Sequence, residues 1–300
     1  MSKHISPKLV VAGAGYVGTA LVLRARDLGM EVTALTRNLE RIANFERQGI
    51  AAVACTLSDI GDFRDSLPDR VDYVVNLVSS ASRSPEGYRE SYIEGQQALM
   101  DWAISSGARR YVYTSSTSVY GEHGGDWVDE DTPLAPASQF GEILVEAERC
   151  VEGSVLDSTV LRLGGIYGPE RHLLWNQVVH AEGQTLPGYG DIYLNLIHRE
   201  DIVGAILAVL SRERLPRARY NAVDGRPSTR QEIVDWIAVE LGRGPLRYDP
   251  ASAHKDARGS RFSGGRRPNR KIRSSYLSQE VGWTPAIEDF RAGYRQLGLC

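Results

Sequence analysis

A glycine-rich turn near the start of this 300-residue chain constrains its fold more than any other sequence feature. An apolar, strand-like run leads into Gly13, Gly15 and Gly18, in the pattern G-x-G-x-x-G, and a helical pattern follows. The first glycine permits a tight turn, the second lets the backbone approach a pyrophosphate, and the third lets the helix pack on the strand. A helix that begins at Tyr16 and Val17 presents free N–H groups to phosphate. The pattern predicts a dinucleotide-binding turn; the alternative is that the glycines only shape the backbone.

Short apolar runs alternate with helical patterns through the first half of the chain. The predicted strands cover residues 9–12, 32–35, 51–54, 71–78, 110–114 and 158–163, and the predicted helices cover residues 16–28, 38–48, 85–106 and 138–151. Such alternation is typical of βαβ units, and nearly continuous Val, Leu and Ala runs are typical of strands covered on both faces. We therefore expect an α/β fold with a Rossmann-type doubly wound parallel sheet.

The second half of the chain has a looser rhythm, rich in glycine, proline and aromatic residues between 164 and 193. Helices are predicted at 201–210, 229–241 and 287–297 and a strand at 219–223, and Thr229 and Glu232 match a capping box. We expect residues 1–165 to form a dinucleotide-binding domain, with returning segments near 193–212 and 219–223. Residues 166–300 are expected to form a smaller α+β substrate-binding cap that does not fold independently.

Composition and charge exclude several classes of protein. A net charge of −3 gives no positive field for nucleic acid or an anionic membrane. No apolar run approaches the roughly 18 residues of a membrane-spanning helix, and residues 1–8 lack the apolar core of a signal peptide. Cys55, Cys150 and Cys300 are far apart, which predicts neither a disulfide framework nor a metal site. We expect a cytoplasmic protein without a membrane, nucleic-acid or metal partner.

The end of the second predicted strand determines the expected cofactor. NAD-binding folds place an acid there for the ribose 2′-hydroxyl, whereas NADP-binding folds use arginine for the 2′-phosphate. This chain has Thr36 and Arg37 and no acid at that point, and the guanidinium fork suits phosphate. We therefore expect NADP(H) to be preferred over NAD(H); the alternative is that Arg37 is a solvated surface residue.

Several segments of the chain resemble one enzyme family. Residues 111–121, Tyr-Val-Tyr-Thr-Ser-Ser-Thr-Ser-Val-Tyr-Gly, resemble the fifth-strand segment of extended short-chain dehydrogenases/reductases of the NAD-dependent epimerase/dehydratase family. Residues 127–133 resemble the acidic loop of that family, residues 161–171 its next strand and turn, and residues 195–201 the segment before its cap helix. Together with the glycine-rich turn, these segments occur in the family's order and cover nearly the whole chain.

The resemblance implies roles for residues around the cofactor. Ser116 stands at the position of the family's Ser or Thr, whose hydroxyl bonds the reacting oxygen of the substrate; the alternative is a capping or turn serine. Further cofactor contacts are expected from Val78, Ser79 and Thr114, and substrate contacts from Ser80, Thr117, Arg171 and His198.

The resemblance breaks at the family's Tyr-x-x-x-Lys element. Phe140 stands at the Tyr position and Leu144 at the Lys position, and the predicted helix 138–151 contains neither Tyr nor Lys. Because Phe cannot donate a proton, the chain resembles the atypical members of the family, which bind the dinucleotide without this pair. The candidates for a catalytic role include Tyr92 and Tyr167, each with packing as the alternative.

These observations leave two classes of function open. The first is an NADP(H)-dependent oxidoreductase or epimerase-type enzyme that acts on a small hydroxy or keto compound with a non-standard proton donor. The basic residues between 266 and 273 suit an anionic substrate, with a solvated loop as the alternative. The second class is a non-catalytic NADP(H)-binding sensor or regulatory protein. The apolar positions of helices 85–106 and 138–151 predict a homodimer, unless a monomer buries them.

Overall fold

The computed structural model describes residues 6–80, 82, 84–172, 174–181, 183–255 and 266–299. The chain divides into two compact units. Unit 1 consists of Met1–Ser116, Glu142–Arg162 and Val203–Tyr220, and unit 2 of Thr117–Gly141, Leu163–Ile202 and Asn221–Cys300. Cys300 and the first five residues lie outside the described residues. The expected division of roles between residues 1–165 and residues 166–300 stays a prediction.

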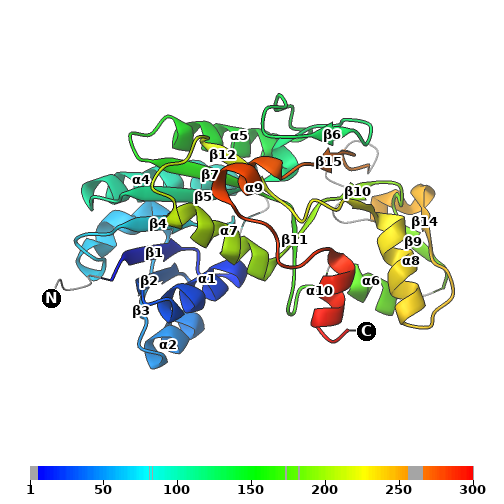
Figure 1. Cartoon of the computed structure of the whole chain (residues 1–300), viewed down its shortest axis with the longest axis horizontal. Coiled ribbons are helices and arrows are strands. Elements are labelled where there is room, and N and C mark those ends of the chain that lie inside the picture. The colour runs from blue at the N-terminus through cyan, green and yellow to red at the C-terminus, as the bar shows by residue number, and fades with distance from the viewer. Residues whose placement is uncertain are drawn as a thin grey trace. The chain divides into compact units, whose positions relative to one another are not determined.

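Seven strands of the described chain form one sheet, in the order β12-β7-β5-β4-β1-β2-β3 (Figure 1). Their bounds are Lys8–Ala12 (β1), Glu31–Thr36 (β2), Ala51–Ala54 (β3), Tyr73–Asn76 (β4), Arg110–Ser116 (β5), Ser158–Leu163 (β7) and Arg219–Ala222 (β12). Strand β1 pairs in parallel with both β2 and β4, so Val10 lies beside Thr33 and Val74. From β1 the chain adds β2 and β3 on one side, and it then returns to add β4 on the other side of β1. Open α/β sheets bind ligands outside the carboxyl ends of strands at such a switch point. This order confirms the predicted Rossmann-type fold.

Helices cover both faces of this sheet. They are α1 (Tyr16–Asp27), α2 (Leu39–Arg47), α3 (Pro85–Arg89), α4 (Gly95–Ser105), α5 (Gln139–Glu152), α7 (Arg199–Ser211) and the 3₁₀ helix η1 (Leu57–Ser66). Leu99 of α4 and Ala147 of α5 share one buried core with Val10, Val74 and Tyr111 of the sheet. Figure 1 shows α4 and α5 on one side of the sheet and α1 and α7 on the other. Coverage of both faces explains why the strands are apolar throughout.

The helix predicted at 85–106 is interrupted. Helix α3 passes into a π-helical turn, η2 (Glu90–Glu94), before α4 begins at Gly95. A Cβ at Gly95 would lie 2.9 Å from the Cβ of Leu57 in η1, so this position needs glycine for close packing. Single π turns inside helices occur frequently at functional sites, and this one contains Tyr92.

The apolar residues that predicted a homodimer are largely buried within the single chain. Leu99, Trp102 and Ala103 of α4 are at most 4% exposed, and Ala147 and Val151 of α5 are fully buried. Most of the apolar side chains on which the dimer prediction was based are therefore not exposed on the single chain. The homodimer stays a prediction.

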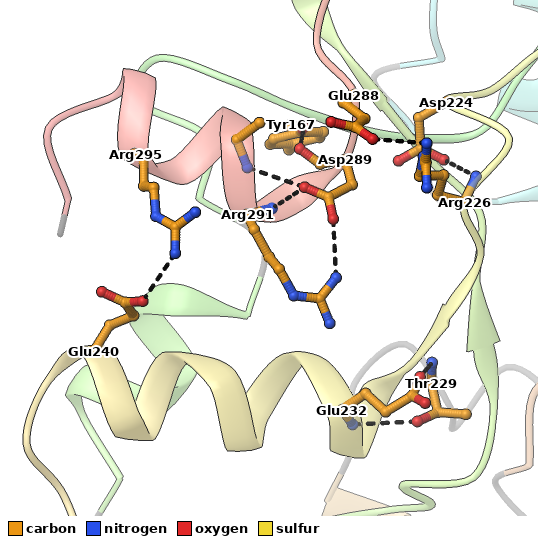
Figure 2. Close-up of polar contacts among 11 residues, drawn as sticks. Tyr167, Asp224, Arg226, Thr229, Glu232, Glu240, Glu288, Asp289, Arg291 and Arg295 are labelled. Carbon is orange, nitrogen blue, oxygen red and sulfur yellow. Dashed lines mark hydrogen bonds and ion pairs between the residues drawn. The ribbon is translucent and has the colours of Figure 1, made fainter.

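Unit 2 is built from short paired strands and helices around an aromatic core. The parallel pairs are β6 (Trp127–Val128) with β15 (Lys271–Ile272), β8 (Gly165–Tyr167) with β11 (Leu196–His198), and β9 (Thr185–Pro187) with β14 (Arg247–Asp249); β10 (Tyr193–Leu194) pairs antiparallel with β13 (Ser228–Thr229). Its helices are η3 (Thr117–Val119), α6 (Trp175–Val179), α8 (Arg230–Glu240), η4 (Pro250–Lys255), α9 (Ser275–Val281) and α10 (Phe290–Gln296). Thr229 and Glu232 form the predicted capping box at the start of α8 (Figure 2).

Candidate functional site

The glycine-rich turn has a backbone that larger residues cannot adopt. Gly13 has a φ of 84°, and a Cβ at this position would lie 2.7 Å from the Val78 nitrogen. A Cβ at Gly18 would overlap the carbonyl oxygen of Gly13. The Gly13 N–H donates to the Leu35 carbonyl oxygen at 3.0 Å, which joins the turn to β2. The turn therefore allows the close backbone approach that a pyrophosphate requires.

Helix α1 begins at Tyr16 without a competing cap. Gly15 occupies the N-cap position and supplies no side-chain hydrogen bond, and the first turn, which includes Val17, contains no acidic residue. The N–H groups and the partial positive charge of such a helix start attract anions. The predicted cofactor-binding residues Gly15, Tyr16, Val17 and Gly18 thus belong to one helix start, and Gly13 lies in the turn before it.

Two arginines flank this helix start. Arg37 is exposed after the end of β2, and it forms no hydrogen bond or ion pair with the part of the chain that the structure describes. Arg41, in the first turn of α2, donates from Nη1 to the Ala14 carbonyl oxygen at 3.1 Å. The same Nη1 would lie 3.5 Å from a Cβ at Gly15. Sequence analysis missed Arg41, although its four-residue spacing from Arg37 was a usable signal.

Two hydrogen bonds shape the loop that carries Arg37. The Asn38 N–H donates to Thr36 Oγ1 at 3.2 Å. Asn38 in turn caps α2, because its Oδ1 accepts from the Arg41 N–H at 3.0 Å. The Thr36 hydroxyl, predicted to contact the cofactor, is therefore engaged in this loop as an acceptor.

A buried asparagine links the carboxyl ends of β4 and β5. Asn76 Oδ1 accepts from the Val78 N–H at 3.0 Å, and its Nδ2 donates to the Tyr111 hydroxyl at 3.1 Å. The Thr114 hydroxyl donates to the Asn76 carbonyl oxygen at 3.1 Å. The structure therefore brings Val78 and Thr114 together at the switch point, with Ser79 exposed in the adjoining loop.

Ser80 and Tyr92 also lie together. The Ser80 N–H donates to the Tyr92 hydroxyl at 3.4 Å, and the Ser80 hydroxyl donates to the Gly87 carbonyl oxygen at 2.9 Å. Burial, and then the neighbouring Tyr88, raises the pKa of Tyr92 to about 12, against a smaller opposing contribution from the Ser80 N–H. Tyr92 therefore holds its proton at neutral pH.

Ser116 lies at the end of β5, and Phe140 and Leu144, which replace the family's Tyr and Lys, lie on α5. Ser116 ends β5 and is half-buried. On α5, Phe140 and Leu144 are one turn apart, and Leu144 is 6% exposed. One turn further, Glu148 forms a buried ion pair with Arg162, with Nη2 and Oε2 2.7 Å apart. The Leu144 position is therefore packed as core.

Tyr167 is fully buried in unit 2 and contacts the start of α10 (Figure 2). Its hydroxyl donates to the Asp289 carbonyl oxygen at 3.1 Å, and a Cβ at Gly293 would overlap the ring. Burial, and then the nearby Asp224 carboxylate, raises the pKa of Tyr167. This environment favours packing, the alternative that the sequence left open, over proton transfer.

His198 packs edge-on against Tyr167, with ring centroids 5.1 Å apart. Its Nδ1 accepts from the Glu200 N–H at 3.3 Å. Burial lowers the pKa of His198, so the ring is neutral at pH 7. Its Nε2 is buried and has no hydrogen-bond partner among the described residues. These contacts fit a bridge between segments better than a contact to an exposed substrate.

Asp224 is a buried carboxyl group that sequence analysis missed. Its Oδ1 accepts from the Arg226 N–H at 2.9 Å (Figure 2). Its Oδ2 is buried and has no hydrogen-bond partner among the described residues. Burial, and then the negative charges of Asp289 and Asp201, raises the pKa of Asp224 to about 8. No sequence signal marks it, because the shift arises from packing of distant segments.

Comparison with known proteins identifies the sequence family of the chain. A model of the NAD dependent epimerase/dehydratase family matches residues 9–222, more than two thirds of the sequence. The chain belongs to this family. The match confirms the resemblance carried by residues 111–121 and 161–171. The loss of the Tyr and Lys at Phe140 and Leu144 stays a sequence-based prediction.

Several similar proteins match this chain over most of their own length. Protein YeeZ of Escherichia coli K12 is 32% identical over 252 residues, which cover 80% of this chain and 86% of YeeZ. A 3-diazoavenalumate denitrifying reductase of Streptomyces sp is 27% identical over 301 residues, covering 95% of this chain and 98% of the reductase. The structure of a Thermus thermophilus UDP-glucose 4-epimerase in complex with NAD matches with a TM-score of 0.77 at 20% identity, covering 97% and 99% of the two chains. This last likeness shows the fold.

The family's Tyr-Gly-Pro turn carries the remaining predicted substrate residue. Arg171 is exposed and forms a two-way backbone bridge with Gly168, with N–O distances of 3.0 and 3.2 Å. The intervening Glu170 has a φ of 63°. The tight turn therefore presents the Arg171 side chain at the surface of unit 2.

Two classes of feature are absent from the described parts of this family member. Their His, Cys, Asp and Glu side chains form no group of three or more that could hold a metal ion. No helix among them has both the length and the apolar character needed to cross a membrane.

Proposed function

We propose that this chain is an NADP(H)-dependent oxidoreductase or epimerase-type enzyme that acts on a hydroxy or keto group of a small compound. The single observation that carries the proposal is the uncapped start of α1, with Arg37 and Arg41 beside it and no acid at the end of β2. Family membership supports the dinucleotide and the reaction class. When bound, the nicotinamide supplies or accepts hydride.

The NADP(H) preference rests on the charges around the turn. The segment Thr36–Arg37–Asn38 contains no carboxylate that would repel a 2′-phosphate or bond a 2′-hydroxyl. Arg37 has no described partner, so its guanidinium is available for an anion. Arg41 is held at the turn through Ala14 and adds a second positive charge. A charge-assisted hydrogen bond to phosphate contributes about 1.5–3 kcal/mol, which is enough for a clear preference.

The proposed chemistry uses the chain's hydroxyl groups in place of the Tyr-Lys pair. Ser116 would bond the reacting oxygen of the substrate. Of the two tyrosine candidates, Tyr92 fits proton transfer better than Tyr167, because its oxygen accepts a backbone N–H and its own proton has no described acceptor. Tyr167 already donates to Asp289. The raised pKa of Tyr92 keeps its proton in place throughout the neutral range and makes it a weak acid.

Nucleotide-linked sugars are the first substrates to test. A relative of this chain from Streptomyces lividans, 25% identical over 319 residues, is a UDP-glucose 4-epimerase. Exposed Arg171 of unit 2 suits an anionic compound of this kind. Carboxylate-bearing hydroxy and keto compounds form the second group of probes.

The second candidate function is a non-catalytic NADP(H)-binding sensor. It is favoured by Phe140 and by the buried Leu144, which leave α5 without the Tyr that donates a proton and the Lys that bonds the ribose in the family. Under this function the cofactor would bind with the same preference, but no probe would react.

The deciding experiment measures binding and turnover separately. Calorimetry with NADPH and NADH tests the cofactor, and NADPH absorbance together with product analysis for UDP-glucose, UDP-glucuronic acid and dTDP-glucose tests the reaction. Turnover that Ser116→Ala abolishes would support the enzyme. Tight NADPH binding without reaction of any probe would favour the sensor, and equal affinity for both cofactors would refute the NADP(H) preference.

A further inference from the structure

Arg270 is a half-buried arginine of unit 2 whose side chain binds backbone carbonyl groups. Its Nη2 donates to the Thr117 carbonyl oxygen at 2.7 Å, and its Nη1 donates to the Gly121 carbonyl oxygen at 3.3 Å. The two acceptors bracket the turn that begins immediately after Ser116 in the sequence. A planar guanidinium can bridge two such carbonyl groups in one fixed geometry.

This charge is not balanced by a direct ion pair. No carboxylate of the described residues lies within ion-pair distance of Arg270, and its Nε is buried without a partner there. Glu122 is the nearest acid by charge interaction, but its two oxygens accept from the N–H groups of Asn269 and Gly124, each at 2.7 Å. Burial lowers the pKa of Arg270 to about 10, a shift that Glu122 partly offsets. The guanidinium therefore stays charged at neutral pH.

A half-buried charge of this kind, with a buried Nε, is costly and needs a reason. Desolvation of a charged group without an ion-pair partner opposes folding, and a buried donor without an acceptor adds to that cost. A neutral side chain of similar length would avoid both costs. The positions of the two acceptors supply the reason, because both lie in the turn after Ser116.

The backbone of the same segment holds a different stretch of chain. The Asn269 carbonyl oxygen accepts from the His123 and Gly125 N–H groups, each at 3.1 Å. The Lys271 N–H donates to the Asp126 carbonyl oxygen at 2.9 Å. These bonds attach residues 123–128 whatever side chain stands at position 270. The Arg270 side chain, by contrast, reaches residues 117–121.

We propose that Arg270 is a positioning residue that fixes the Thr117–Gly121 segment and thereby holds the Ser116–Thr117 hydroxyl groups in reactive geometry. This role rests on the proposed function of Ser116. It also separates Arg270 from a phosphate-binding role, because both of its terminal nitrogens are already committed to carbonyl groups.

The test compares Arg270→Met and Arg270→Lys with the matched control Arg266→Met. Arg266 lies on the same segment but is paired with Asp191 at 2.9 Å, with both side chains at least 40% exposed. Amide hydrogen exchange is followed separately for residues 117–122 and 123–128. We expect Arg270→Met to speed exchange in the first stretch by at least ~10-fold and in the second by less than ~3-fold. Arg270→Lys, which can still donate to Thr117, should recover part of the protection, and the control should change neither stretch.

Turnover and cofactor binding complete the test. With NADPH and UDP-glucose, or the other sugar nucleotide that reacts, Arg270→Met should lower kcat by at least ~10-fold while KM changes less than ~3-fold. The affinity for NADPH should stay within ~3-fold of wild type, because the turn that binds it belongs to unit 1. Parallel loosening of both stretches, or local loosening without a change in kcat, would overturn the proposal. If the wild-type protein turns over no probe, the proposed enzyme function fails, whereas hydrogen exchange still decides whether Arg270 fixes the segment.

Discussion

Arg41 reaches from α2 to the glycine-rich turn, where its Nη1 donates to the carbonyl oxygen of Ala14 at 3.1 Å. This bond places a guanidinium at the start of α1, in addition to the exposed Arg37 at the end of β2. Arg37 and Arg41 are four residues apart in the sequence, and each positive charge attracts an anion. The pair therefore favours a cofactor with an additional phosphate group.

Replacing these arginines should reveal the cofactor preference directly. We expect Arg37→Ala to weaken NADPH binding by about 10–100-fold, the worth of one charge-assisted contact, and to leave NADH binding nearly unchanged. Arg41→Ala should have a smaller effect in the same direction, because Ala14 already accepts one of its N–H groups. Calorimetry on both cofactors measures the effects. Arg47→Ala, at the exposed end of α2, is the control. A loss of NADPH affinity in this variant would show that the effect comes from overall positive charge and not from a specific contact.

Removing the Ser116 hydroxyl should harm catalysis more than changing Phe140. A hydroxyl that polarises the reacting oxygen is worth about 10²–10³ in kcat, whereas Phe140→Leu removes no proton donor. Turnover of the two variants with the same sugar nucleotide provides the comparison, with folding checked by calorimetry. Full activity of Ser116→Ala would show that the family-based role of this residue does not apply here.

Alanine at Gly293 should be less destabilising when Tyr167 lacks its hydroxyl, although the overlap with the ring edge remains. A Cβ at Gly293 would overlap the Tyr167 hydroxyl and ring edge, so we expect Gly293→Ala to cost about 1–3 kcal/mol. Tyr167→Phe alone loses one hydrogen bond to Asp289, worth about 1 kcal/mol. Denaturant unfolding should show that the double variant is more stable than the sum of the single changes. Gly61→Ala, where no atom lies within 4 Å of the new Cβ, is the matched control.

The same double-mutant cycle also tests the role of Tyr167. If Tyr167 only packs, Tyr167→Phe should keep kcat within about threefold of wild type, because the ring and its neighbours remain. A loss of kcat without a loss of stability would instead return Tyr167 to the catalytic candidates.

Asp224 should make the stability of the protein depend on pH. Its pKa is raised to about 8 in the folded state, compared with an ordinary value of about 4 in the unfolded chain. Between these values the folded state keeps a proton that the unfolded state releases, so the free energy of unfolding falls as pH rises. Above about pH 8 this loss is complete.

Asp224→Asn should remove this dependence. The amide keeps an oxygen for the Arg226 N–H and cannot ionise, so the variant should be more stable than wild type at pH 9 by at least about 1 kcal/mol. Unfolding at pH 6 and pH 9 measures the difference, and Asp191→Asn at the exposed ion pair provides the control. An unchanged pH slope in Asp224→Asn would mean that the carboxyl group is ionised in the native state at both pH values.

Local sequence patterns predicted the elements that hold the cofactor turn. The glycines at 13 and 18 are spaced by steric needs that any such turn imposes, and the structure has both close approaches. Thr229 and Glu232 cap α8 as expected, because a capping box involves only four consecutive residues. The strands of the sheet could also be predicted from their apolar runs, because burial on both faces favours apolar residues throughout.

Features produced by packing of distant segments were beyond the sequence. The partners of Arg270 lie about 150 residues earlier in the chain, and the separations between the paired residues are 153 and 149. The Tyr167 hydroxyl meets a carbonyl 122 residues away. The raised pKa of Asp224 likewise depends first on its burial and then on the charges of Asp289 and Asp201, which are distant in the sequence. No local sequence pattern predicts contacts between residues so far apart in the chain. The catalytic candidates were therefore harder to rank than the cofactor-binding residues.

The sheet order β12-β7-β5 has a consequence for synthesis of the chain on the ribosome. Strand β5 ends at Ser116, but its neighbour β7 begins only at Ser158 and β12 only at Arg219. A nascent chain of the first 150 residues therefore carries β5 as an open edge, with unpaired N–H and C=O groups along an apolar strand. Such edges pair readily with other chains. Completion of the cofactor-binding sheet must wait for residues that belong to the last third of the polypeptide, which makes early termination products prone to aggregation.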